Sequence, residues 1–104
     1  MRWMERQGAR ILGRNVRTRA GEIDLVALEG KTLVLVEVKT RSGPAGGLPE
    51  EAVDARRLRR LSRAGEAYAA AHGLTGARMR IDVIALDAVA EGGFRCRRRK
   101  DVTS

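Results

Sequence analysis

Three acidic residues and one lysine are the side chains in this sequence whose types and spacing are best suited to chemistry. Glu22 and Asp24 lie in one apolar run, and Glu37 and Lys39 lie in the next, within GEIDLVALEGKTLVLVEVKTR at residues 21–41. If the carboxylates converge on a partly buried surface, they repel one another and require protonation or a cation. After compensation by the lysine, about two negative charges remain, which a hard divalent ion such as Mg²⁺ or Mn²⁺ would neutralise.

The two apolar runs predict a β-hairpin that positions these charges. A two-residue turn at 29–30 would join strands at about 22–28 and 32–40. In that register Glu22 faces Glu37, and all four charges share one face of the sheet, with opposed Cβ atoms about 5 Å apart. A slip of one residue would send the acids of the two strands to opposite faces, so the register decides the prediction.

A simpler interpretation of the four charges is that they are solvated residues at strand ends, held in ordinary salt bridges. Single charges usually are, but three acids and a lysine on one face of an apolar hairpin favour a binding site. Lys39 supports this view, because the sequence has only three lysines against eighteen arginines. A lysine ammonium is compact and its pKa shifts on burial, which suits the positioning or activation of water.

The rest of the chain predicts one mixed β-sheet flanked by helices, an α/β fold. Residues 33–38 are almost continuously aliphatic, as in a central strand covered on both faces. A helical crossover would make the third and fourth strands parallel. The single domain covers 1–91, and 92–104 form a basic C-terminal tail with room for a short edge strand. The other expected elements are the end of a truncated leading helix at 1–7, strands at 9–18 and 78–87, and a long helix from Pro49 to His72.

The composition narrows the class of protein. The chain has 104 residues, with 21 basic and 13 acidic side chains and a net charge of +8. This balance favours a polyanionic partner such as nucleic acid, although an arginine-biased genome explains it equally well. The single cysteine, Cys96, excludes an internal disulfide and a cysteine-rich zinc site. Since no apolar run approaches about 18 residues and the N-terminus lacks a signal core, we expect a cytoplasmic protein without a membrane segment.

A set of arginines is predicted to track phosphates on either side of the acidic pocket. They come from the first strand, the end of the hairpin and one face of the long helix: Arg17, Arg19, Arg41, Arg56, Arg59, Arg60 and Arg63. The alternative is a solvated helix face with intrahelical ion pairs. The three aromatic residues, Trp3, Tyr68 and Phe94, are scattered, which favours duplex or branched DNA over stacked single strands.

The same residues resemble the PD-(D/E)XK nuclease superfamily. Asp24, followed by Glu37-Val38-Lys39, fits its acid…(D/E)-X-K signature, although Ile23 stands where the superfamily's name has a proline. The wider run over about residues 8–87 is similar to the YraN family of small bacterial endonuclease-like proteins. This resemblance implies a restriction-endonuclease-like αβββαβ core with its leading helix truncated.

The resemblance also implies a function and a set of site residues. It implies a metal-dependent DNA endonuclease that hydrolyses phosphodiester bonds, acting on branched or repair intermediates as the Holliday junction resolvases of the superfamily do. Asp24, Glu37 and the carbonyl oxygen of Val38 would bind Mg²⁺ (or Mn²⁺). Lys39 would orient or deprotonate the attacking water, and Glu22 would be an additional acid.

Other functions stay open at this point. Members of the family carry a glutamate on the leading helix, and that position would fall upstream of Met1. Its absence favours a non-catalytic nucleic-acid-binding module on the nuclease fold. An adaptor that binds an acidic protein or ribosomal RNA is a third interpretation. A homodimer is one option for the assembly, because nucleases of this type that cut both strands often need two copies.

Overall fold

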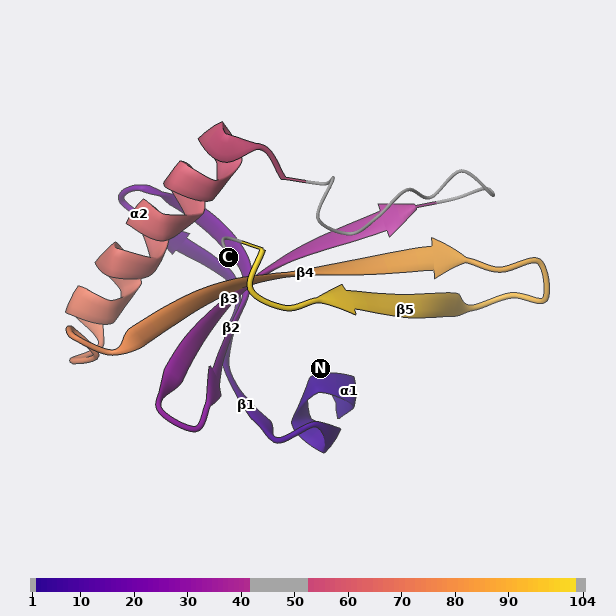
Figure 1. Ribbon diagram of the computed structural model, residues 1–104, viewed down its shortest axis with the longest axis horizontal. Coiled ribbons are helices and arrows are strands. Elements are labelled where there is room, and N and C mark those ends of the chain that lie inside the picture. The colour runs from indigo at the N-terminus through magenta and orange to yellow at the C-terminus, as the bar shows by residue number, and fades with distance from the viewer. Residues whose placement is uncertain (1, 42–52, 103–104) are drawn as a thin grey trace.

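The computed structural model of the protein describes residues 2–41 and 53–102. The elements confirm the predicted αβββαβ order and add one strand at its end (Figure 1). The predicted helix start at Pro49 lies outside the described residues. In chain order the elements are α1 (Arg2–Arg6), β1 (Ala9–Thr18), β2 (Gly21–Glu29), β3 (Thr32–Arg41), α2 (Ala55–Ala71), β4 (Arg78–Ala88) and β5 (Phe94–Arg99).

The strands form one mixed sheet in the order β1-β2-β3-β4-β5. The β3–β4 pair is parallel, as predicted for strands joined by a helical crossover, and the other neighbouring pairs are antiparallel. The segment predicted as a basic tail with a short edge strand forms β5, which pairs with β4. Within the part of the chain that the structure describes, neither helix is long and apolar enough to cross a membrane.

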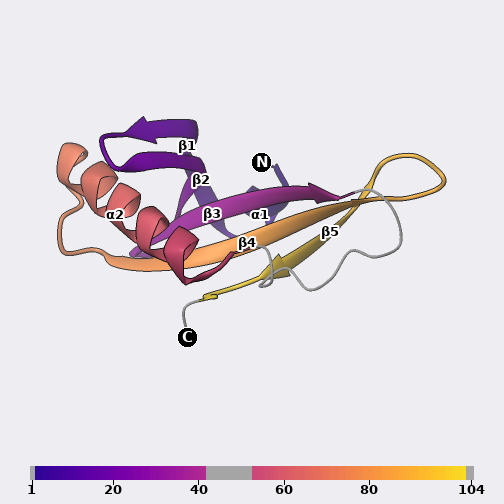
Figure 2. The same ribbon diagram turned by 90° about the horizontal axis from the view of Figure 1, so that it is seen from above.

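The core lies on both faces of the central strand β3. One face of the sheet is covered by α2 (Figure 2), and on that face Leu33 and Leu35 belong to the same buried cluster as Leu61 of the helix. On the other face, Val34 and Val36 belong to a second cluster that includes Met4 of α1 and Ile84 of β4. All four β3 side chains are fully buried. The prediction of a central strand covered on both faces is confirmed, because alternate side chains of one strand enter two separate clusters.

The turn between β2 and β3 differs from the prediction. The loop is 30–31 and not 29–30, because Glu29 pairs with Thr32. Gly30 has a φ of +60°, a left-handed conformation that glycine adopts without steric cost. The predicted pairing of Glu22 with Glu37 is therefore wrong, since the strands are shifted by two residues. A shift of two residues keeps each side chain on its original face, so the prediction of a shared face does not depend on this error.

Candidate active site

Asp24 of β2 and Glu37 of β3 meet just beyond the last pair of the ladder between these strands, Leu25 with Val36. Their carboxyl groups lie close enough that each shifts the pKa of the other. Oδ2 of Asp24 also accepts a hydrogen bond of 2.8 Å from the main-chain N–H of Val38. Where the strand pairing ends, a side-chain bond thus continues the link between β2 and β3 and holds Asp24 against Glu37.

Arg57, near the start of α2, neutralises Glu37. Its Nε donates to Oε2 of Glu37 at 2.6 Å, and its Nη2 donates to Oε1 at 2.9 Å. This is the two-bond geometry in which guanidinium binds carboxylate most strongly. The Glu37 side chain is 2% exposed and the Arg57 side chain 33% exposed. The helix therefore places a cation over the buried carboxylate, on the side that solvent reaches.

The two carboxyl groups have pKa values shifted in opposite directions. Burial raises the pKa of Asp24, and the contact with Glu37 raises it further, although the N–H of Val38 acts against this. Burial would also raise the pKa of Glu37, but Arg57, Asp24 and Lys39 together outweigh burial and lower it. Glu37 is therefore the acid that stays ionised, and Asp24 is the one that takes up a proton first.

Lys39 and Glu22 lie at the edge of this site. Lys39 follows Glu37 by two residues on β3, is exposed, and contributes to the lowered pKa of Glu37 through its charge. Glu22 is 67% exposed and forms an ion pair of 3.2 Å with Arg17, the residue opposite it on β1. Of the three acids predicted to converge, the structure thus brings Asp24 and Glu37 into contact and places Glu22 in a surface ion pair.

The residues present fit a hard divalent cation in their chemistry. Asp24 and Glu37 supply carboxylate oxygens, which Mg²⁺ and Mn²⁺ prefer, and the main chain of Val38 lies beside them. Burial is the largest cause of the raised pKa of Asp24, and a cation beside the pair would lower the cost of ionising this carboxyl group. Among the described residues, no group of three His, Cys, Asp or Glu side chains is arranged to hold a metal ion. Any such ion would therefore rely on two side chains and on main-chain or water oxygens.

Arg57 was not predicted as a site residue, because it does not share the helical spacing of the four arginines predicted to bind phosphate. A signal was nevertheless present, because Arg57 precedes Leu61 by four residues and Ala64 by seven, and both of these are buried. An arginine on the buried stripe of a helix is expected to have a buried acidic partner.

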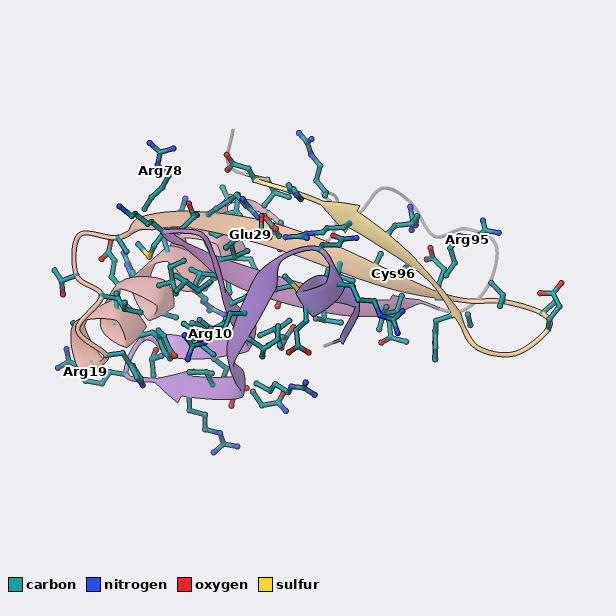
Figure 3. All side chains as sticks on the ribbon, turned by 90° about the horizontal axis from the view of Figure 1, so that it is seen from below. Arg10, Arg19, Glu29, Arg78, Arg95 and Cys96 are labelled. Atoms are coloured by element: carbon teal, nitrogen blue, oxygen red, sulfur yellow. The ribbon has the colours of Figure 1, made fainter. Side chains whose placement is uncertain are left out.

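The arginines predicted to bind phosphate are placed in two groups. Arg17 and Arg19 are exposed near the β1–β2 turn, and Figure 3 shows Arg19 close to α2. The side chain of Arg41, the last residue of β3, lies outside the described residues. The remaining members are all exposed on α2: Arg56, Arg59, Arg60 and Arg63. Their exposure agrees with phosphate binding or with a solvated face, so this role stays a prediction.

A separate ionic cluster surrounds Asp82 of β4, which is fully buried. Its carboxylate accepts hydrogen bonds from Arg80, from Arg98 of β5 and from the main-chain N–H of Asp101. Both arginines also bind Glu29, which lies next to the β4–β5 pair (Figure 3). The bonds from Arg98 and Asp101 fasten the C-terminal segment to the sheet.

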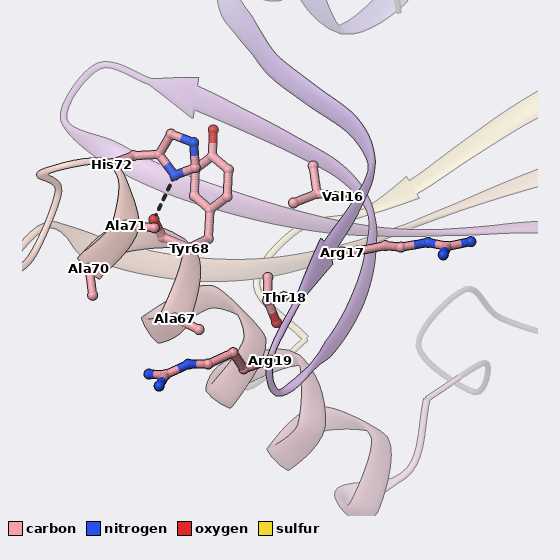
Figure 4. Close-up of a pocket in the computed structure, with 9 residues that line it drawn as sticks. All are labelled: Val16, Arg17, Thr18, Arg19, Ala67, Tyr68, Ala70, Ala71 and His72. Carbon is pink, nitrogen blue, oxygen red and sulfur yellow. Dashed lines mark hydrogen bonds between the residues drawn. The ribbon is translucent and has the colours of Figure 1, made fainter.

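A cavity of about 480 Å³ lies between the end of β1 and the C-terminal half of α2 (Figure 4). The rings of Tyr68 and His72 stack in its wall with centroids 4.0 Å apart. Nδ1 of His72 is 2.9 Å from the carbonyl oxygen of Tyr68. The side chain of Arg17 points away from the cavity (Figure 4). Neither member of the acid pair lines it, so the cavity is distinct from the predicted site.

The sequence profile of the Uncharacterised protein family UPF0102 matches residues 1–86. The chain belongs to the UPF0102 family. It is 49% identical over 90 residues to a UPF0102 protein of Symbiobacterium thermophilum, an alignment that covers 86% of this chain and 76% of the relative. It is 46% identical over 94 residues to one of Beutenbergia cavernae, which covers 90% and 80%. The predicted membership in this YraN-like family is confirmed.

Solved structures show a weaker likeness to this UPF0102 chain. One is the structure of Pyrococcus furiosus SfsA in complex with Ca²⁺, with a TM-score of 0.40 and 14% sequence identity. The alignment covers 90% of this chain and 55% of SfsA. A TM-score of this size carries no argument about a shared site, so the functional inference rests on the residues of this chain.

Proposed function

We propose that this UPF0102 protein is a metal-dependent DNA endonuclease that hydrolyses phosphodiester bonds in branched or repair intermediates. The observation that supports this function best is the placement of Asp24 beside Glu37, where the main-chain N–H of Val38 holds the Asp24 carboxylate, with Lys39 two residues further along β3. Two carboxylates held together beside a lysine are the residue types that metal-dependent phosphodiester hydrolysis requires.

The residues of the site would have separate roles in this reaction. Asp24, Glu37 and the main-chain carbonyl of Val38 would hold Mg²⁺ or Mn²⁺, which polarises a phosphoryl oxygen and lowers the pKa of bound water. The side chain of Lys39, exposed at the edge of the pair, would orient the attacking water as the ammonium or take its proton as the neutral amine. Burial of Glu37 keeps its carboxylate in a fixed position for this purpose.

We propose duplex or branched DNA in the cytoplasm as the partner. The net charge of +8 and the two groups of exposed arginines support a polyanionic ligand. Phosphates on one side would contact Arg17 and Arg19, and those on the other would contact Arg41 and the α2 set, Arg56, Arg59, Arg60 and Arg63. A homodimer would supply one site for each strand where both strands are cut at one place.

One observation favours a second candidate, a nucleic-acid-binding module that does not cut. Arg57 donates to both carboxylate oxygens of Glu37, so a positively charged side chain already binds the carboxylate that would hold the metal ion. If Arg57 stays in place when DNA is bound, Glu37 has less capacity to hold a metal ion, and the basic surface would bind DNA without cleavage.

A cleavage assay separates the two candidates. Purified protein is incubated with labelled duplex and four-way junction DNA in Mg²⁺, Mn²⁺ or EDTA, and DNA binding is measured in parallel by fluorescence anisotropy. We expect metal-dependent nicking, and a loss of at least about 100-fold in rate for Lys39→Ala with little change in DNA affinity. Lys31→Ala is the matched control, because Lys31 is an exposed lysine in the turn of the same hairpin.

Two results would decide against the endonuclease. Binding without metal-dependent cleavage leaves the non-catalytic module. Cleavage by Lys39→Ala at the rate of the Lys31→Ala control would show that a contaminating nuclease or a different site is responsible.

A further inference from the structure

Arg57 occupies the place at the acid pair that a divalent ion would approach. Its guanidinium holds both oxygens of Glu37, at 2.6 and 2.9 Å. The charges of Asp24 and Glu22 attract the same guanidinium. The acid pair is therefore partly neutralised by a side chain of the protein itself, and a metal ion that binds Glu37 must compete with it.

The structure allows this side chain to change partners. The main chain of Arg57 is held in place, because its N–H donates to the N-cap residue Asp54 at 2.8 Å. Its side chain is 33% exposed, whereas the Glu37 side chain beneath it is 2% exposed. Rotation about the side-chain bonds would carry the guanidinium from the buried carboxylate to a group that arrives from solvent, without any movement of α2.

A phosphodiester is the group whose chemistry matches this guanidinium. Arginine binds carboxylate and phosphate through the same pair of parallel hydrogen bonds. The exposed neighbours Arg56 and Arg60 on α2 would draw the same polyanion to this end of the helix. A nucleic-acid phosphate at the acid pair would thus compete with Glu37 for Arg57.

We propose that Arg57 exchanges partners when nucleic acid binds, from Glu37 in the free protein to a backbone phosphate in the complex. The exchange leaves both oxygens of Glu37 to the metal ion and removes positive charge from the carboxylate that the ion approaches. Metal ion and nucleic acid therefore bind cooperatively, and the coupling is equal in both directions. This inference rests on the proposed metal site at Asp24 and Glu37, and it makes Arg57 a positioning residue that acts through Glu37.

Mn²⁺ binding, measured from the EPR signal of the free ion, tests the exchange. Each protein is titrated with Mn²⁺ alone and with a saturating short DNA duplex, and the duplex alone is the blank for ions bound by DNA. For the wild type we expect the duplex to raise the Mn²⁺ affinity about tenfold, within the range typical of coupled sites. Arg57→Gln should bind Mn²⁺ more tightly than the wild type without DNA, and the duplex should change its affinity less than about twofold.

Arg78→Gln is the matched control, because it removes one positive charge from an exposed position at the start of β4, outside both the acid pair and the arginines proposed to bind phosphate. It should keep the wild-type ratio of the Mn²⁺ affinity with the duplex to the Mn²⁺ affinity without it. The exchange is overturned if Arg57→Gln keeps that ratio, if it binds Mn²⁺ no more tightly than the wild type without DNA, or if none of the proteins binds Mn²⁺.

A second variant covers the case in which Arg57→Gln is unfolded, as thermal melting by circular dichroism would show. Arg57→Lys keeps the charge but cannot form two parallel hydrogen bonds to one phosphate or carboxylate. If the duplex raises the Mn²⁺ affinity of Arg57→Lys by a smaller factor than that of the wild type, the exchange is supported. An unchanged factor overturns it.

A gel of the duplex after each titration separates this inference from the endonuclease activity. Cooperative binding without cleavage supports the exchange in a protein that binds metal and DNA but does not cut. Metal-dependent cleavage without cooperative binding supports the endonuclease and overturns the exchange, which leaves Arg57 as a fixed counter-ion of Glu37.

Discussion

Asp24→Asn is expected to stabilise the fold while it removes the proposed metal binding. In the folded protein, burial and the contact with Glu37 raise the pKa of Asp24, so at neutral pH the ionised side chain opposes folding. Asparagine keeps a carbonyl oxygen that can accept the N–H of Val38, and its amide can donate to the Glu37 carboxylate. The variant thus retains one hydrogen bond and replaces a like-charge contact with a second.

The expected gain is about 1 kcal/mol, the typical net value of one hydrogen bond and less than for a fully buried bond to a charged group, because Asp24 is only partly buried. In a domain of this size that corresponds to a rise in Tm of roughly 4–8 °C. The gain also has a defined pH dependence. A raised folded pKa means that the contribution of Asp24 to stability is fully present below about pH 3.9 and is lost as the pH rises through the folded value. The stability difference between variant and wild type should therefore increase from acid to neutral pH.

Urea unfolding followed by circular dichroism at several pH values measures this difference, with Glu22→Gln as the control. Glu22 is an acid of the same strand but is 67% exposed, so its replacement should leave stability almost unchanged. The reasoning is refuted if Asp24→Asn is less stable than the wild type at neutral pH, or if its advantage is the same at acid pH. Either result would mean that Asp24 is adequately neutralised in the folded protein.

Two further predictions concern the positions that fasten the sheet and the helix. Asp82→Asn should destabilise the fold by about 3 kcal/mol in urea unfolding, because it removes the buried negative charge to which Arg80 and Arg98 both donate. Burial by itself would raise the pKa of Asp82, but Arg80, the Asp101 N–H and Arg98 together lower it. The stability of the wild type should therefore fall as the pH drops below about 3.9. The variant should lose less stability over the same pH range. Gly65→Ala should also destabilise, by about 1 kcal/mol net, because overpacking outweighs the better helix propensity. Its Cβ would lie 2.3 Å from Cδ1 of the buried Leu35, and a more stable variant would show that Leu35 can repack.

Much of the fold could be predicted because the relevant patterns are local. The unbroken aliphatic run of β3 predicted a strand with core on both faces, and the two clusters around Leu33 and Val34 confirm it. The turn was predicted one residue early, because Glu29 and Gly30 both suit a turn and the apolar runs on either side do not distinguish 29–30 from 30–31. The conformation of Gly30, with φ of +60°, decides it.

The partners of the buried charges could not be predicted in the same way. Arg57 and Glu37 are 20 residues apart, and Arg98 and Asp82 are 16 apart. Each pair depends on where one element lies over another, which the spacing within a single helix or strand does not contain. The position of Arg57 on the buried stripe of α2 indicated that it needs a partner, but several acids were available.

The sequence by itself determined that Glu37 and Lys39 share a face of one strand, because side chains two residues apart on a strand always do. It also determined membership in the family, through the wider run over about residues 8–87. Only the tertiary structure decided which acids meet and which cation neutralises them. Asp24 reaches Glu37 because the ladder ends beside them, and Glu22 turns to Arg17 because β1 pairs there. Arg57 reaches Glu37 because the start of α2 lies over β3, and a packing arrangement of this kind is set by the whole core and not by any one segment.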